Sequence, residues 1–129
     1  MVATDFDAER TYDDERFTAR TIFETERQKV VLGFFAPGQF IPVHAPDSDV
    51  AITVHDGRGV VRDGETEHAV AAGDVVVVPA GVERGVRADA DSRLEATLVT
   101  APPPTDAEHA PVREGLAHGV FDPEHIREK

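Results

Sequence analysis

The residues of this chain that are best suited to chemistry are a histidine and an arginine, His44 and Arg84. His44 lies in the segment 37–57, PGQFIPVHAPDSDVAITVHDG, six residues after the glycine of a Pro-Gly turn. An imidazole can bind a transition metal or transfer a proton near neutral pH. A guanidinium is a permanent cation that can bind a carboxylate or phosphate through two hydrogen bonds. His55 and His68 follow along the chain and are further candidate metal ligands.

These side chains must be positioned by β-structure. From Phe17 onward, short apolar or alternating runs are separated by glycine, proline and aspartate at regular intervals, which is the pattern of an all-β sandwich or barrel. Asp56-Gly57 and Asp63-Gly64 favour the positive φ angles of tight hairpins. We therefore predict eight strands, over residues 17–24, 29–35, 50–55, 59–63, 67–70, 74–79, 84–88 and 93–100.

Two terminal segments flank this body. Residues 1–16 are predicted to form an irregular N-terminal arm, residues 17–100 the barrel, and residues 101–129 a C-terminal tail that packs on the barrel. Within the tail, Thr105 and Glu108 have the spacing of a capping box, which predicts a short helix. The histidines of the tail are predicted to be solvated; they are His109, His118 and His125.

One strand suggests a partner. The run DVVVVP, residues 74–79, is apolar at successive positions, whereas a strand with one solvated face alternates apolar and polar residues. Its outer face is therefore expected to be covered by the N-terminal arm or by another subunit. We predict a homodimer.

The composition limits the function. The 129 residues contain 25 Asp and Glu against 13 Lys and Arg, which gives a net charge of −12, and only Lys29 and Lys129 are lysines. Such an acidic surface argues against nucleic acid and membranes as partners. It is typical of cytosolic proteins of salt-accumulating halophiles such as haloarchaea. The acidic N-terminus is unlike a signal peptide, and no apolar run approaches the roughly 20 residues that cross a bilayer. A cytoplasmic location is expected, and the absence of cysteine excludes thiolate chemistry.

Two spaced motifs frame His44 and Arg84. The first runs Gly, five residues, His-x-His, three or four residues, Glu, six residues, Gly, and the second runs Gly, five residues, Pro-x-Gly, two residues, His. With both spacings intact, the chain resembles the cupins, specifically the small single-domain kind, over residues 28–100. The positions that fit are Gly38, His44, Pro46, Val50 and Gly57, and then Gly73, Pro79, Gly81 and Arg84.

The resemblance implies a jelly-roll β-barrel whose mouth holds the ligand. In metal-binding members, three histidines and one glutamate converge inside the barrel and hold Fe, Mn, Ni, Zn or Cu. Of these four positions the chain keeps only His44, because Pro46, Val50 and Arg84 occupy the others. No cofactor is therefore expected. The alternative is a divalent transition metal held by His44 with a non-standard ligand such as His55 or His68, although His55 lies an odd number of residues from Val50 and should face away.

If the two motifs fold as they do in the cupins, His44 and Arg84 face one cavity, with Val50 and Phe40 beside them. A guanidinium buried there needs a carboxylate of the protein, an anionic ligand or water. Two functions remain open: a metal-free protein that binds a small molecule, which can be an anion, with His44 as hydrogen-bond donor or general base; and a metal-dependent enzyme of the dioxygenase or isomerase type. The candidate internal partners of Arg84 are Asp47, Asp49 and Glu95.

Overall fold

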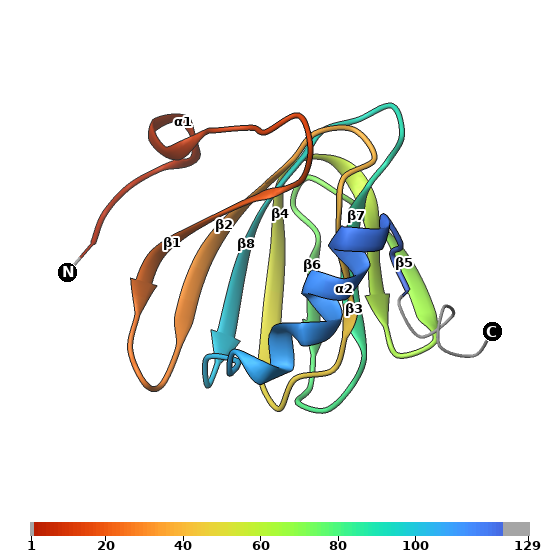
Figure 1. Cartoon of the computed structure of the whole chain (residues 1–129). Coiled ribbons are helices and arrows are strands. Elements are labelled where there is room, and N and C mark those ends of the chain that lie inside the picture. The colour runs from red at the N-terminus through yellow and green to blue at the C-terminus, as the bar shows by residue number, and fades with distance from the viewer. Residues whose placement is uncertain (1, 123–129) are drawn as a thin grey trace.

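The structure is a computed structural model that describes residues 2–122. Eight antiparallel strands form one curled sheet in the order β1-β2-β8-β4-β7-β3, with β5 and β6 both paired to β4 (Figure 1). The predicted all-β jelly roll is confirmed, as are the N-terminal arm and the tail with its short helix. The strands are β1 (Thr18–Glu24), β2 (Lys29–Phe35), β3 (Phe40–His44), β4 (Asp49–Asp63), β5 (Thr66–Ala71), β6 (Val75–Val78), β7 (Arg84–Ala88) and β8 (Leu94–Ala101).

Strand β4 joins the two walls of the barrel, and here one predicted hairpin is wrong. The first half of β4 pairs with β6 and β8, and the second half pairs with β5 and β7. Asp56-Gly57 lies within this strand, where the register with β8 shifts after Val54, instead of forming a turn. Gly57 has φ 83°, and a Cβ there would lie 1.7 Å from the carbonyl oxygen of Arg93. A bulge built on a glycine uses the same positive φ as a tight hairpin, so the dipeptide alone does not distinguish them.

Strand β3 is absent from the predicted set because Pro42 interrupts its sequence. Among residues 2–122 it pairs only with β7, so a proline without an N–H is tolerated on its other edge. The tail covers it: η1 (Ala107–His109) is followed by α2 (Ala110–His118), and a Cβ on Gly115 would lie 2.5 Å from Cβ of Pro42. Glycine at position 115 is what allows the helix to pack this closely on β3.

The predicted capping box is present at the start of the tail helices. The Thr105 N–H donates to Glu108 Oε1 at 2.9 Å, and the Glu108 N–H donates to Thr105 Oγ1 at 3.3 Å. The second oxygen of Glu108 accepts from the N–H of Asp47 at 2.6 Å, which ties the tail to the loop before β4. No helix among residues 2–122 has the length and apolar character needed to cross a membrane.

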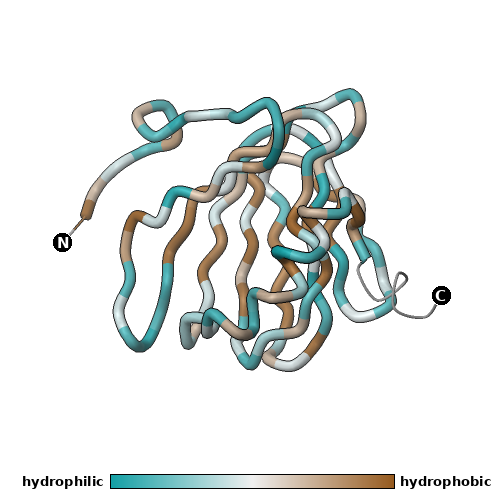
Figure 2. Tube along the Cα trace, in the orientation of Figure 1, coloured by the Kyte–Doolittle hydropathy of each residue, from teal (hydrophilic) through white to brown (hydrophobic). Residues whose placement is uncertain are grey.

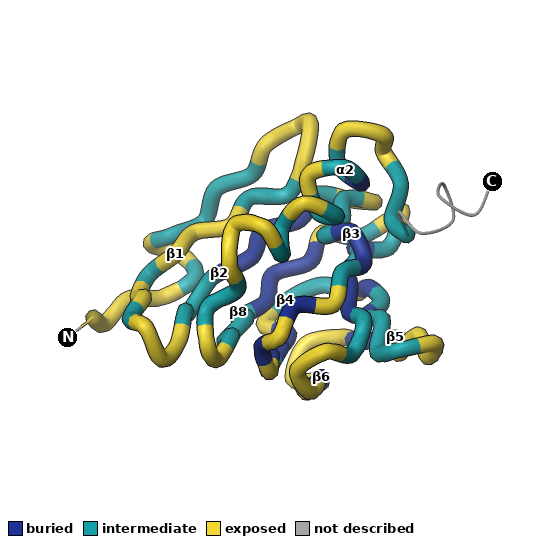
Figure 3. The backbone as a smooth tube through the Cα atoms, turned by 60° about the horizontal axis from the view of Figure 1, so that its bottom comes forward, coloured by how far each residue is buried: buried dark blue, intermediate teal, exposed yellow. Residues whose placement is uncertain are grey.

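The core lies between the two walls and is built from the inward positions of the strands. Figure 2 shows how apolar residues collect along the strands and polar residues at the turns, and Figure 3 shows the buried backbone at the centre of the sheet. The cluster comprises Phe35, Val50, Ile52, Val54, Val61, Val70, Val78, Val86, Ala88, Leu94 and Ala96. This period of two is the pattern from which the strands were predicted.

The N-terminal arm covers the outer face of β2, β8 and β4. It contains the short helix α1 (Phe6–Glu9), whose Asp5 cap accepts from the Ala8 N–H at 2.7 Å. Phe6 stacks on His55 with ring centroids 4.1 Å apart, and Tyr12 meets Phe34 edge-on. The arm does not reach β6, where Val75 and Val77 are each 60% exposed (Figure 3). Of the two covers expected for the 74–79 strand, the N-terminal arm is therefore wrong, and another subunit stays a prediction.

Candidate functional site

A cavity of about 280 Å³ lies between the two walls of the barrel, beneath the tail helices. Strands β1, β2, β8 and β4 supply one wall, β3 and β7 supply the other, and the tail supplies the rim. The lining residues are Phe17, Ala19, Lys29, Val31, Ile41, His44, Pro46, Val50, Ile52, Arg84, Gly85, Val86, Leu98, Thr100, Pro104, His109, Val112 and Arg113.

The strand register divides the cavity into a polar end and an apolar interior. Thr100 on β8 pairs with Lys29 on one side and Val50 on the other, so these three residues form the row nearest the strand ends. Two residues further along each strand, the same wall presents an entirely apolar row, Val31, Leu98 and Ile52. On the opposite wall, His44 pairs with Arg84, and the row above it is Ile41 with Val86. The cavity is therefore amphipathic.

His44 is a neutral imidazole at neutral pH. Its Nδ1 lies 3.0 Å from the carbonyl oxygen of Pro42, and because a carbonyl can only accept, Nδ1 carries the hydrogen. Burial lowers the pKa of His44 to about 4, with the charges of His109 and Arg84 acting in the same direction. So low a pKa makes His44 a weak base, which is poorly matched to the predicted role of general base near neutral pH. Its Nε2 is left as a hydrogen-bond acceptor.

Arg84 is bound by backbone carbonyls, and the carboxylate partners proposed for it are wrong. The residue is 4% exposed: Nη1 donates to the Ser48 oxygen at 2.6 Å, Nη2 to the Pro79 oxygen at 2.8 Å, and Nε and Nη2 to the Val82 oxygen at 3.1 and 3.0 Å. Burial lowers its pKa, opposed by nearby charges, that of Asp49 first. Four of the five N–H donors are thus used, which leaves one on Nη1.

The proposed carboxylates are engaged elsewhere. Glu95 is 0% exposed and lies on the outer face, where Arg10 binds it through Nε at 2.6 Å and Nη2 at 2.9 Å, and Tyr12 donates to it at 2.5 Å. Asp49 accepts from the Ala80 N–H at 2.9 Å. Asp47 is exposed. Arg84 therefore joins the loop before β4 to the loop before β7 without a direct ion pair.

The structure places Val50 on the cavity wall but not Phe40. Phe40 meets Phe121 edge-on, with ring centroids 6.0 Å apart, and is not among the lining residues, so its prediction as a site residue is wrong. The reason is that β3 bulges between Ile41 and His44, which changes which side chains face inward before and after Pro42. Which side chains of residues 40–44 face the cavity could therefore not be predicted from their sequence alone.

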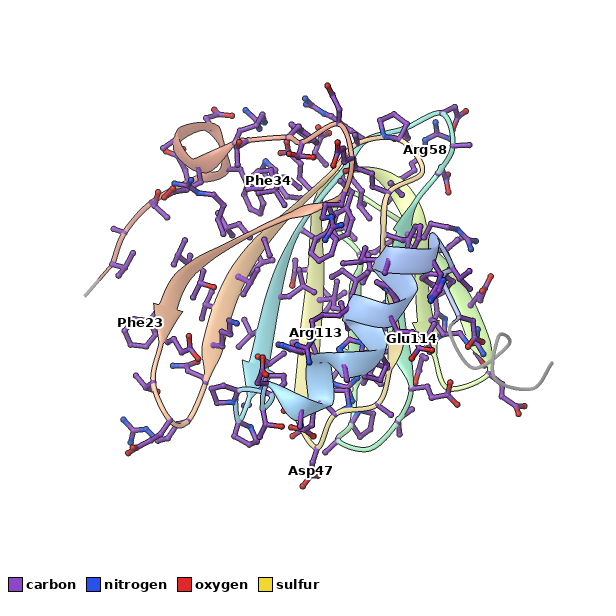
Figure 4. The ribbon with its side chains drawn as sticks, viewed as in Figure 1. Phe23, Phe34, Asp47, Arg58, Arg113 and Glu114 are labelled. Atoms are coloured by element: carbon purple, nitrogen blue, oxygen red, sulfur yellow. The ribbon has the colours of Figure 1, made fainter. Side chains whose placement is uncertain are left out.

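Sequence reasoning missed the contribution of the tail. His109, predicted to be solvated, is half-buried at the rim with its ring centroid 6.2 Å from that of His44. Burial lowers its pKa, helped by the charges of Lys29 and Arg113. Figure 4 shows Arg113 projecting from α2 in front of the barrel. The i, i+3, i+4 spacing of His109, Val112 and Arg113 was the available signal of one helix face. His118 is exposed as predicted, and His125 lies outside the described residues.

The alternative metal ligands, His55 and His68, do not lie in the cavity with His44. His55 points outward onto Phe6, as the parity argument predicted: the alternation from Val50 holds up to Val54, and His55 is the extra residue of the bulge that follows. His68 lies on β5 with Nε2 3.4 Å from Asp63 Oδ2, exposed on the outside. Within residues 2–122 no group of three His, Cys, Asp or Glu side chains is placed to hold a metal. The donor set of the site does not fit a metal ion.

The charge of the cavity lining is opposite to that of the chain. No Asp or Glu of the described residues lines the cavity, although the chain carries 25 of them. The charged lining residues are three cations, namely Lys29, Arg84 and Arg113. The polar end of the cavity can therefore donate hydrogen bonds and attract anions, whereas His44 Nε2 can accept.

Comparison with known proteins agrees with this architecture. Residues 31–100 match the cupin domain family. The structure of TT1209 from Thermus thermophilus is 34% identical with a TM-score of 0.77, and the match covers 81% of this chain and 100% of that one. An RmlC-like cupin protein from Desulfovibrio desulfuricans is 31% identical with a TM-score of 0.70, covering 80% of this chain and 98% of that one.

A more distant structure shares the fold alone. The polyketide cyclase RemF from Streptomyces resistomycificus is 16% identical with a TM-score of 0.63, and the match covers 70% of this chain and 68% of that one. No curated protein sequence matches the chain.

Proposed function

The chain belongs to the cupin family, and we propose that it is a metal-independent protein that binds one small organic molecule inside its barrel. The observation that supports this most directly is the amphipathic cavity of about 280 Å³, with an apolar interior and a polar end at the rim. Pockets of this kind hold the apolar body of a ligand, while a few polar groups set its orientation.

The residues at the family's metal positions support binding without a metal. Pro46 and Val50 have no ligand atom, and Arg84 brings a positive charge to the place of a third ligand. Only His44 remains at these positions, and with His109 at the rim the cavity offers at most two imidazoles, fewer than the three protein ligands of a typical transition-metal centre. Its Nδ1–H is directed to the Pro42 carbonyl, so a ligand hydroxyl or amine can donate to Nε2. The single unused N–H of Arg84 is a further contact for an acceptor on the ligand.

Binding is better supported than catalysis. His44 has a pKa of about 4, which makes it a weak base, and Arg84 is held by the carbonyls of two loops. Neither side chain has a neighbouring carboxylate that would form a proton-transfer pair with it among the described contacts. The polyketide cyclase named above is an enzyme, but its similarity extends to the fold alone.

Two measurements test this proposal. Elemental analysis of protein purified in high-salt buffer should find negligible transition metal, whereas one tightly bound ion per chain would contradict metal independence. Thermal shift and calorimetry against a panel of small organic molecules, neutral and charged, should find binding that is lost in Val112→Trp, which fills the rim. Ala117→Trp is the matched control, because Ala117 lies exposed on the same helix and does not line the cavity. Binding unaffected by Val112→Trp would place the ligand elsewhere.

A further inference from the structure

Lys29 is an unpaired cation on the wall of the cavity. It is the single lysine among residues 2–122, it is half-buried, and its ammonium makes no hydrogen bond or ion pair with any residue in that range. The other two cavity cations are already engaged. Arg84 donates to three carbonyls, and Arg113 contacts Asp106 through Nη1 at 3.3 Å to the carboxylate and Nη2 at 3.2 Å to the carbonyl.

The neighbourhood of Lys29 lacks a compensating charge. No carboxylate of the described residues lines the cavity, although acidic residues outnumber basic ones in the chain by 25 to 13. Thr100 lies directly opposite Lys29 in the β2–β8 pair, and its hydroxyl oxygen is buried with no hydrogen-bond partner among residues 2–122. A partly desolvated ammonium beside an unpartnered hydroxyl is costly unless water or a ligand satisfies both groups, and a ligand that accepts from both can take the place of that water.

The two walls of the polar end differ in what they accept. On the β3–β7 wall, His44 presents the lone pair of Nε2, which repels the lone pairs of an anion, and Arg84 has a single N–H left, on Nη1. On the β2–β8 wall, Lys29 and Thr100 are both donors. An anionic group that enters the cavity is therefore directed to Lys29, and the apolar remainder of the ligand lies against Val31, Leu98 and Ile52.

We propose that the ligand is an organic monocarboxylate with an apolar tail, and that Lys29 is the residue that selects its charge. This inference rests on the proposed small-molecule function. Lys29 is the one cavity cation without an ion pair or carbonyl contacts among residues 2–122, and its single positive charge matches one negative charge, whereas a phosphate dianion carries about two. Anion recognition is therefore expected at Lys29, which the sequence motifs did not identify. Arg84 is held by backbone carbonyls instead.

The test compares an acid with its neutral isosteres in calorimetry. Hexanoate, hexanamide and 1-hexanol are titrated into the wild type and into Lys29→Met and Lys29→Arg. The wild type should bind hexanoate roughly tenfold or more tighter than hexanamide, as expected for a charge-assisted hydrogen bond. Lys29→Met should lose this preference but keep its binding of hexanamide and 1-hexanol, and Lys29→Arg should retain the preference.

The matched control is Arg27→Met, which removes one positive charge from the same β1–β2 hairpin at an exposed position outside the cavity. It should leave the preference for hexanoate unchanged, and circular dichroism should show that all variants are folded. Equal binding of hexanoate and hexanamide by the wild type, or a preference that survives in Lys29→Met, would overturn the role of Lys29 and leave the proposed function standing. Failure of all three probes to bind would overturn both.

Discussion

His44 and Arg84 lie directly opposite each other on β3 and β7, and both direct their side-chain N–H groups to backbone carbonyls. His44 donates to Pro42, two residues before it in the chain, and Arg84 donates to the loops that precede β4 and β7. These two residues therefore hold the polar end of the barrel together as well as lining it. Their structural and binding roles can be separated by stability measurements.

Arg84→Met should destabilise the fold. The change leaves the buried Ser48 carbonyl and the partly buried contacts at Pro79 and Val82 without their donor, so the free energy of unfolding should fall by about 2–4 kcal/mol. Guanidinium-chloride denaturation measures this. Arg58→Met is the control, because the Arg58–Asp91 pair is exposed and worth less than about 1 kcal/mol. Equal stability of Arg84→Met and wild type would show that the carbonyl contacts contribute nothing.

Glu95→Gln should release the N-terminal arm. Glu95 is buried beneath Arg10 and Tyr12, and removing its charge should cost about 2–4 kcal/mol at pH 7 and expose the arm to limited proteolysis. Asp7→Asn is the control, because Asp7 pairs with the same arginine at the exposed surface. An arm that remains protected in Glu95→Gln would contradict this role.

The loss of stability in Glu95→Gln should depend on pH. Burial of Glu95 raises its pKa, but the hydrogen bonds from Arg10 and Tyr12 outweigh burial and lower the pKa overall. The stabilisation is therefore fully present above the ordinary glutamate pKa of about 4.5 and is lost as the pH falls through the lower, folded value. The difference in stability between wild type and Glu95→Gln should narrow below about pH 4.5. A difference in the free energy of unfolding that stays constant across this pH range would contradict the stabilising role of the Glu95 charge.

His44 should make the fold sensitive to mild acid. Its folded pKa of about 4 lies below the ordinary value of 6.5, so the unfolded chain binds a proton more readily. The stabilisation is complete above about pH 6.5 and is lost as the pH falls towards 4, by up to about 3 kcal/mol. His44→Gln should flatten this slope in denaturation curves, and the exposed His68→Gln should not. An NMR titration of His44 with a midpoint near 6.5 would contradict the assignment.

The homodimer predicted from the sequence remains to be tested at β6. Val75 and Val77 are exposed on a strand that pairs only with β4 within the described part of the chain, and a second copy is the expected cover. Light scattering in molar KCl should find a dimer, and the double change Val75→Glu with Val77→Glu should convert it to a folded monomer. Val2→Glu changes an exposed valine outside the strands and is the control. A monomeric wild type would contradict the prediction.

The sequence by itself determined the features that depend on local physical rules. Alternation with a period of two identified most strands and correctly turned His55 away from the cavity, because successive side chains on a strand point to opposite faces. The spacing of Thr105 and Glu108 predicted the two hydrogen bonds between them, because both bonds of a capping box form within four consecutive residues. The placement of His44, Val50 and Arg84 on one cavity followed from the resemblance of their two spaced motifs to the cupins, and the structure agrees with it.

Only the tertiary structure decided what each of these residues contacts. Backbone carbonyls carry no signature in a sequence, so the partners of Arg84 could not be distinguished from the carboxylates Asp49 and Glu95. Asp56-Gly57 permits both a hairpin and a bulge, and the choice was made by the pairing of β4 with β8. Lys29 acquires its importance in the same way, because its isolation from the acidic side chains of the described residues depends on how six strands and the tail close around one cavity.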